Sequence, residues 1–298
     1  MTKSNRLRAL ALLGALLVTV PKGDAWADET DPEGWQFRVT PNVWAIGVDG
    51  TLGLGELPDG DVDIPFHDIL DHLDFWLGGR AEAQKGKWLL YGDGLTTTLG
   101  VNEGFSPTFG PFILGPVTVG PFDVGPGGRH QIGPFTFSKV IGPFTETIDL
   151  DIKLKLNILE LGGAYRLGQW PIDSAGKEWS LDILLGGRYT GVEVEVSLDD
   201  QSASLFEEWV DPFAGVRVDV DLSPKWDLVV SADFGGFGVG SDFTWNAWGM
   251  FGYQWHENKR LTFGYRGLYQ DFETGSGTTR FKWDNTLHGP VAGIEISF

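Results

Sequence analysis

The sequence contains no cysteine, which removes a disulfide framework, a thiolate metal site and a cysteine nucleophile. Positive charge is also scarce. The chain has 22 Lys and Arg against 41 Asp and Glu, for a formal net charge of −19. An acidic chain of this kind repels the phosphate backbone, so we expect no nucleic-acid partner. We expect no cofactor either.

Long hydrophobic runs are missing from most of the chain. One apolar run, Ala9–Val20, follows three basic residues and precedes an Ala-x-Ala site that ends at Ala27. These are the three parts of a cleaved secretory signal peptide, and the run is shorter than the roughly 20 residues of a membrane-spanning helix. We therefore expect residues 1–27 to be removed after export, which leaves 28–298 as one domain.

Apolar residues make up 42% of the sequence but are dispersed. Strict alternation is clearest in Thr147–Ile158, where Ile or Leu occupies every second position and the positions between are mostly charged. Period two indicates a β-strand with one apolar face, found both in transmembrane β-barrels and in soluble β-sandwiches. After Ile158 the apolar residues change parity, at Leu159 and Leu161, which indicates either a β-bulge or the passage of the strand into a membrane.

The expected strands are long, and their connections alternate between short and long. Strands of this length match the 9–11 residues that a tilted strand needs to cross a bilayer, and the alternation is typical of short periplasmic turns and long outer loops. The sequence therefore predicts an all-β fold, a transmembrane antiparallel up-and-down β-barrel of about ten strands, within a range of roughly 8–12. The ten segments are Trp35–Val48, Phe75–Gln84, Trp88–Leu99, Thr147–Arg166, Trp179–Val196, Trp209–Leu222, Trp226–Phe237, Phe243–Trp255, Leu261–Phe272 and Phe281–Phe298.

Tryptophan gathers at one end of these segments. An indole ring can bury its apolar surface in lipid while its N–H stays at the headgroups, so aromatic residues form belts at membrane interfaces. We expect these residues to mark the periplasmic side. They are Trp35, Trp88, Trp170, Trp179, Trp226 and Trp255.

The end of the chain carries the most specific pattern. Ile294, Ile296 and Phe298 alternate along the last strand, and Phe298 is the last residue. This resembles the C-terminal signature that the barrel assembly machinery recognises in Gram-negative outer-membrane proteins. The first strand, which begins at Trp35, is similar to that of uncharacterised outer-membrane proteins. The resemblance implies location in the outer membrane, with outer-membrane lipids and the assembly machinery as partners.

Two loops carry patterns of their own. In 101–145, Gly-Pro recurs with a period of five residues from Gly110 to Gly125. We interpret it as chained turns in a long outer loop, either a plain surface loop or a partner-binding or lumen-plugging one, although Val117–Val119 and Thr136–Val140 could pair. In the first long loop, helical spacing predicts a short helix over Phe66–Leu73. Its polar face presents His67, Asp71 and His72, which are too few ligands to predict a metal site.

Charged residues on the polar parity of the strands are expected to line the lumen. Arginine facing carboxylate allows two interpretations, a salt-bridged interior that fills the barrel or a charged constriction that passes small polar solutes or ions. The expected lumen residues are Arg38, Arg80, Glu82, Asp149, Asp151, Asp182, Arg188, Arg217, Asp219, Asp227, Asp233 and Arg266.

The function expected from the sequence is porin-like passage of small polar solutes or ions. The first alternative is a structural or adhesive protein with a closed lumen, and the second is a lipid-acting barrel enzyme. Nucleophilic catalysis by Ser needs His and an acid beside it, and none of the five His shows that arrangement. We therefore predict no enzyme. Pro41 and Pro290 lie in the first and last strands, where missing N–H donors predict either tolerated bulges or a weak seam.

Overall fold

The computed structural model describes residues 34–56, 59–65, 73–101, 117–119, 122–124, 130–132, 135–137, 150–173, 176–198 and 201–298. The expected signal peptide and residues 66–72 of the expected helix lie outside these ranges. Among the described residues, no helix has the length and apolarity needed to cross a membrane.

The chain forms a closed antiparallel barrel of ten strands, as the sequence predicts. Each strand pairs with the next along the chain, and β1 pairs with β16 to close the ring. The barrel strands are β1 (Gln36–Trp44) continued by β2 (Gly47–Leu54), β4 (Leu73–Lys85), β5 (Trp88–Val101), β10 (Leu150–Pro171), β11 (Glu178–Leu198), β12 (Gln201–Ser223), β13 (Trp226–Gly236), β14 (Phe243–His256), β15 (Lys259–Thr274) and β16 (Phe281–Ser297).

The first strand is interrupted, which the sequence did not indicate. β1 and β2 keep one register along β16, with Trp44 opposite Val291 and Gly47 opposite His288. The β1–β4 ladder ends at Pro41, which has no N–H to donate. Beyond it, β2 pairs with β3 (Gly60–Ile64), a short strand in the segment that the sequence assigned to a loop.

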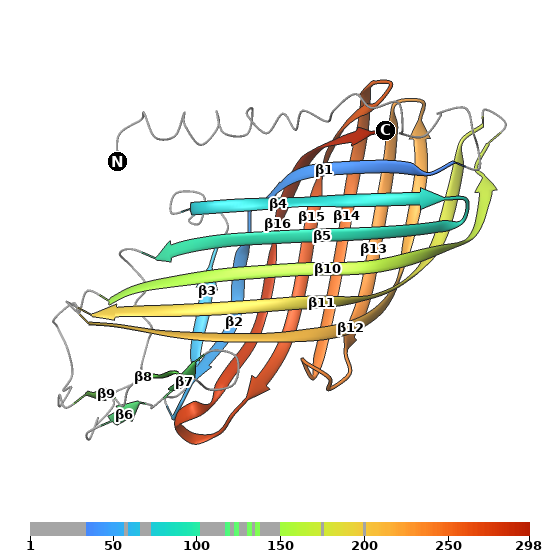
Figure 1. Cartoon of the computed structure of the whole chain (residues 1–298). Helices are drawn as coiled ribbons and strands as arrows, with labels where there is room; N and C mark the ends of the chain where they lie inside the picture. The colour runs from blue at the N-terminus through green and yellow to red at the C-terminus, as the bar shows by residue number, and fades with distance from the viewer. Residues whose placement is uncertain are drawn as a thin grey trace, which may run out of the picture.

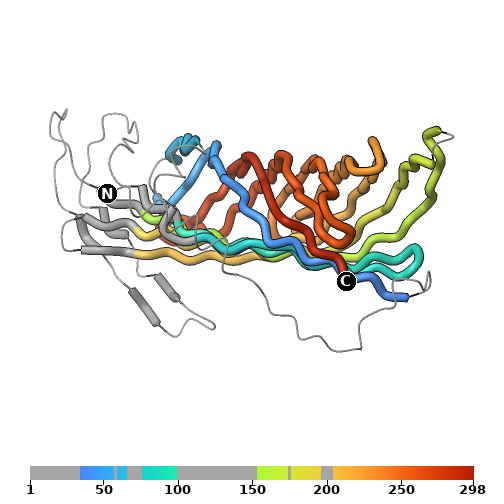
Figure 2. Tube along the Cα trace, turned by 90° about the horizontal axis from the view of Figure 1, so that it is seen from above, coloured from blue at the N-terminus to red at the C-terminus, as the bar shows by residue number. Residues whose placement is uncertain are grey.

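The barrel is flattened (Figures 1 and 2). Strands β4, β5, β10, β11 and β12 form one wall, and β13–β16 cross behind them more steeply, as strands do in orthogonal packing. The three central strands β10–β12 have 22, 21 and 23 residues, whereas β13 has 11. The wall that contains β10–β12 therefore has longer strands than the opposite wall, whose strands have 11 to 17 residues.

The barrel exterior is apolar next to the short turns. Leu161, Leu185 and Val230 point outward and are 60%, 65% and 43% exposed. Five of the six tryptophans at the turn ends of the strands are also exposed, and Trp170 stacks on the half-buried Trp179 with a centroid distance of 4.5 Å. An apolar outer band with aromatic residues at its edge is the surface of a transmembrane barrel.

The change of parity after Ile158 is the passage into the membrane and not a bulge. β10 keeps its register with β11 through this point. Leu156 and Ile158 are buried inside, whereas Leu159 and Leu161 are exposed outside. The alternation is thus continuous, and only the polarity of the two faces changes along the strand.

The Gly-Pro insert contains two small ladders. β6 (Val117–Val119) pairs with β9 (Phe135–Phe137), which confirms the pairing considered for these segments, and β7 (Phe122–Val124) pairs with β8 (His130–Ile132). Chained turns alone are therefore an incomplete description of the insert.

The β2–β3 turn is tied to the start of β16 by charge. Asp59 accepts hydrogen bonds from Arg280 at 2.6 and 3.2 Å, and these hold the pKa of Asp59 below its ordinary value. A depressed pKa in the folded state stabilises the protein above the unfolded pKa, and this stability is lost as pH falls through the folded pKa. We expect Arg280→Gln to raise the pKa of Asp59 and to cost less than about 1 kcal/mol at neutral pH, because the pair is exposed. A carboxyl NMR titration measures the pKa, and an unchanged value would contradict this assignment.

Candidate functional site

A fully buried arginine organises one half of an ion-pair network inside the barrel. Arg188 of β11 is 0% exposed, and its Nε and Nη2 lie 2.8 and 2.7 Å from carboxylate oxygens of Glu160 and Asp233. Glu160 also accepts from Arg266, which lies 2.8 Å from Asp93. These side chains come from five different strands, so the network spans the interior and does not belong to one wall.

Glu82 of β4 is the second centre of the network. Its carboxylate lies 2.7 Å from Arg80 Nε, 2.7 Å from Arg38 Nη2 and 3.2 Å from Arg217 Nη1. Arg217 belongs to β12, which is not a neighbour of β4 in the sheet, so this contact crosses the barrel. Arg80 also lies 4.0 Å from Asp93, which links the two centres.

The interior next to the long connections is apolar. Trp209 of β12 stacks on Phe272 of β15 with ring centroids 4.1 Å apart and planes 8° apart. Side chains in close stacking exclude water from the space between them. Other members of this apolar cluster, each 0–4% exposed, are Trp44, Ile46, Val48, Leu156, Ile158, Val192, Val194, Leu268, Phe281, Trp283 and Leu287.

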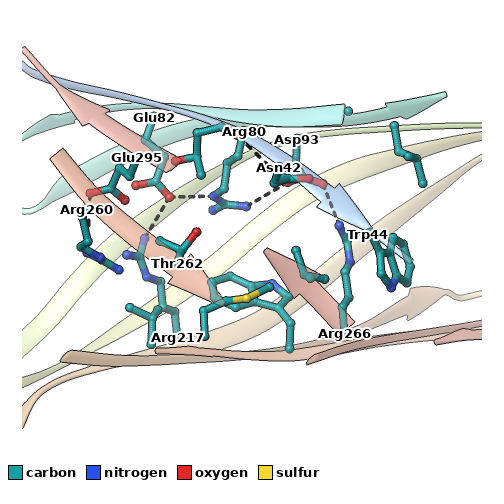
Figure 3. Close-up of a pocket in the computed structure, with 17 residues that line it drawn as sticks. Asn42, Trp44, Arg80, Glu82, Asp93, Arg217, Arg260, Thr262, Arg266 and Glu295 are labelled. Carbon is teal, nitrogen blue, oxygen red and sulfur yellow. Dashed lines mark hydrogen bonds and ion pairs between the residues drawn. The ribbon is translucent and has the colours of Figure 1, made fainter. Parts of the chain in front are cut away.

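A cavity of about 80 Å³ lies within the network. Figure 3 shows Glu82 between Arg80 and Arg217 on one side of it, and Trp44 beside Arg266 on another. The Arg266 guanidinium carbon lies 4.8 Å from the centre of the Trp44 ring, a cation–π distance. The volume admits several water molecules but is small for a ligand pocket, which takes roughly 300–1,000 Å³.

The structure brings most of the expected lumen residues together in ion pairs. Asp182 pairs with Arg166, Asp219 with Arg217, and Asp227 with Arg260. The remaining paired ones are Arg38, Arg80, Glu82, Arg188, Arg217, Asp233 and Arg266. Asp149 lies outside the described residues, and the side chain of Asp151 is not described.

Sequence reasoning placed polar residues inward, and this rule fails in the outer part of β10. Lys153 and Lys155 face outward there, whereas Leu154 and Leu156 are buried. The reasoning also missed Asp93 and Glu160, which join the network. It missed Arg260 and Glu295 as well, which pair with each other and line the same cavity. The sequence could have indicated Glu160, because a carboxylate between the lipid-facing Leu159 and Leu161 lies on the inward parity of the strand.

The described histidines are dispersed. His256 ends β14, and its Nδ1 lies 3.0 Å from Asn258 Oδ1. His288 points outward from β16 and is hydrogen-bonded to Tyr265 and Asp49. Within the described part of the chain, no group of three His, Asp or Glu side chains could hold a metal ion. His67, Asp71 and His72 lie outside that part.

Comparisons with known proteins give structural similarity only. No protein-family model matches the sequence, and no curated protein matches it. One similar structure is the Yersinia pestis attachment invasion locus protein Ail, solved with the heparin analogue sucrose octasulfate. It is 10% identical with a TM-score of 0.35, and the match covers 89% of this chain and 99% of Ail. The Pseudomonas putida toluene transporter TodX is 9% identical with a TM-score of 0.29 and covers 90% of each chain. The translocator domain of the Neisseria meningitidis autotransporter NalP is 10% identical with a TM-score of 0.30. That match covers 98% of this chain and 93% of the NalP domain.

At these TM-scores, none of the similarities assigns an activity. The fold itself rests on the ring of pairings from β1 to β16 and on the apolar exterior with tryptophans at its edge. The chain is a ten-strand antiparallel β-barrel of the kind that Gram-negative bacteria place in the outer membrane.

Proposed function

We propose that this protein is exported by a cleaved signal peptide, inserted in the outer membrane by the barrel assembly machinery, and acts there as a closed barrel. Its function then lies on its outer surface and not in passage through the lumen. The last strand supports the insertion step, because Phe298 exchanges backbone hydrogen bonds with Phe37 of the first strand. An assembly factor that holds the last strand would hold one side of the closing seam.

The observation that carries the closed lumen is the burial of inward-facing side chains. In an open pore, the side chains that line the lumen face water. Here Arg188, Trp283 and Leu156 are at most 1% exposed although they point inward. Eight- to ten-strand barrels have interiors that side chains can fill, so a packed interior fits this strand number.

The outer part of the β10–β12 wall supports a function at the cell surface. Lys155 pairs with Glu193 on the outward face at 3.0 Å, and Lys153 lies opposite Glu195 in the register. Charged pairs of this kind would be costly against hydrocarbon, so this part of the wall stands in water beyond the membrane. Its inward face is apolar, as in a soluble sheet with a core. The barrel thereby supports a charged extension that can contact other surfaces.

Single-channel conductance of the folded mature chain in planar bilayers tests the closed lumen. We expect no regular conductance steps, with a large general porin as the positive control in the same bilayers. Faster gel mobility without heating than after boiling verifies that the barrel is folded. Regular steps from folded protein would contradict the closed lumen.

Porin-like passage of small polar solutes or ions is the second candidate, and the charged cavity favours it. Four arginines and three carboxylates line that cavity, so a small ion would find partners of both signs. Conductance steps with selectivity for one sign of ion would select this candidate.

A further inference from the structure

Three polar side chains form a hydrogen-bonded chain on the outward face of β2, β15 and β16. Tyr265 Oη lies 2.6 Å from His288 Nδ1, and His288 Nε2 contacts a carboxylate oxygen of Asp49. Tyr265 is 48% exposed, and the side chains of His288 and Asp49 are 33% and 47% exposed. Tyr265 and His288 meet across the β15–β16 hairpin, and Asp49 joins them because the barrel closes β16 against β2.

The hydrogen-bond partners select the tautomer of His288. An ionised carboxylate can only accept, so the Nε2–H of His288 donates a hydrogen bond to Asp49. His288 Nδ1 then has a free lone pair, and the Tyr265 hydroxyl donates to it. A hydroxyl that donates to an imidazole held by a carboxylate is the arrangement that activates a nucleophile.

The surroundings leave these groups open to a lipid. The residues opposite His288 in the two neighbouring strands are Gly47 and Gly267, and the ring of Trp245 lies against Gly267. A lipid can still reach the cluster, because Tyr265 and the side chain of His288 are 48% and 33% exposed. On the same outward face, Pro290 and Ile294 continue toward the short turns, and Thr286 and Asp284 lie on the other side. The cluster therefore lies where the apolar band meets a polar one, at the level of ester groups in the outer leaflet.

At the edge of the apolar band, the polar atoms of Tyr265 and His288 need hydrogen-bond partners that hydrocarbon cannot supply. The same two strands provide a comparison one step further from the membrane. Tyr269 Oη donates to Asp284 at 2.9 Å with no imidazole between them. That pair satisfies its polar groups directly, whereas the Tyr265 hydroxyl is coupled to a base.

We propose that Tyr265, His288 and Asp49 form a hydrolytic site for the acyl esters of lipids in the outer leaflet. Tyr265 Oη attacks the ester carbonyl carbon while its proton passes to His288 Nδ1. The bond between that carbon and the lipid alcohol oxygen breaks, and the alcohol leaves with the proton from Nδ1. Water then attacks the acyl-tyrosine, gives one proton to Nδ1, and the fatty acid leaves as that proton returns to the tyrosine oxygen. Asp49 orients the imidazole and stabilises its charged form.

Release of fatty acid from defined vesicles tests the proposal. The folded mature chain is inserted in vesicles of phosphatidylethanolamine or in vesicles that contain lipid A, and free fatty acid is measured by mass spectrometry. We expect Tyr265→Phe, His288→Gln and Asp49→Asn to lower the release rate by at least about 100-fold, the size of a general acid–base contribution. Tyr269→Phe is the matched control, since it removes one outward hydroxyl from the same strand, and it should retain the wild-type rate.

The two vesicle compositions show whether the ester comes from a phospholipid or from lipid A, and release of fatty acid from either supports the site. A mass increase of one acyl chain on the peptide that contains Tyr265 would support the covalent step directly. Heat-modifiable gel mobility shows whether each variant is folded. No release from either lipid by folded wild type, or undiminished release by folded Tyr265→Phe, would overturn the proposal. Neither result depends on whether the lumen is open.

Discussion

Replacing Arg188 with methionine is expected to lower the free energy of unfolding by about 3–5 kcal/mol. Arg188 is completely buried and pairs with both Glu160 and Asp233. Methionine fills a similar volume but leaves Asp233 without a cation and Glu160 with Arg266 alone, and uncompensated buried charge is costly. Urea unfolding of the barrel in lipid vesicles, followed by tryptophan fluorescence, measures the loss.

Two further variants show whether the loss of stability comes from the burial of Arg188 or from the removal of any paired arginine. Arg280→Met removes an arginine that is also paired, but with the exposed carboxylates of Asp59 and Glu273, and should cost less than about 1 kcal/mol. Adding Asp233→Asn to Arg188→Met removes the stranded charge and should restore part of the loss. Equal losses for Arg188→Met and Arg280→Met would mean that water reaches Arg188, contrary to a closed interior.

The barrel could be predicted from the sequence because alternation and turn spacing are local signals. The segment expected over Trp226–Phe237 became β13, and that expected over Phe243–Trp255 became β14, each within one residue at its ends. The strand expected over Trp209–Leu222 begins earlier, at Gln201. Its added residues are partly polar, which resembles a loop, but they pair with β11 as a hairpin outside the membrane.

The break between β1 and β2 could not be predicted, because it depends on partners on both sides. Pro41 ends the ladder with β4, while pairing with β16 continues through Gly47. The sequence shows the proline, but it does not show that β4 is the strand whose pairing ends there.

The interior was only partly predictable for the same reason. Period two identifies the inward face of a strand, and this placed Arg188 and Glu82 among the candidates. It does not say which residues meet across the barrel. Arg217 and Glu82 are separated by 135 positions in the sequence. Their contact depends on how the barrel is flattened. Whether the lumen is filled is likewise a property of packing that no single strand reveals.

Replacing Trp209 with alanine is expected to lower the free energy of unfolding by about 3–5 kcal/mol, the cost of deleting a buried aromatic side chain and leaving a cavity. The ring is 5% exposed, stacks on Phe272, and donates from Nε1 to Asp211 at 3.1 Å. Trp209→Phe retains an aromatic ring and loses this hydrogen bond, so its loss should be smaller. Chemical denaturation in lipid vesicles, followed by circular dichroism, measures each change without depending on this tryptophan's fluorescence.

Phe206→Ala is the control on the same strand, because Phe206 is 40% exposed on the outward face of the β12 extension, next to the charged pairs that place this region in water. Removing an exposed ring there should change stability by no more than about 0.5 kcal/mol. The contrast between the two variants also tests the lumen. If Trp209→Ala cost less than about 1 kcal/mol, the Trp209 ring would already be in contact with water inside the barrel. The apolar cluster would then not seal the interior, and porin-like passage would become the better account of the protein.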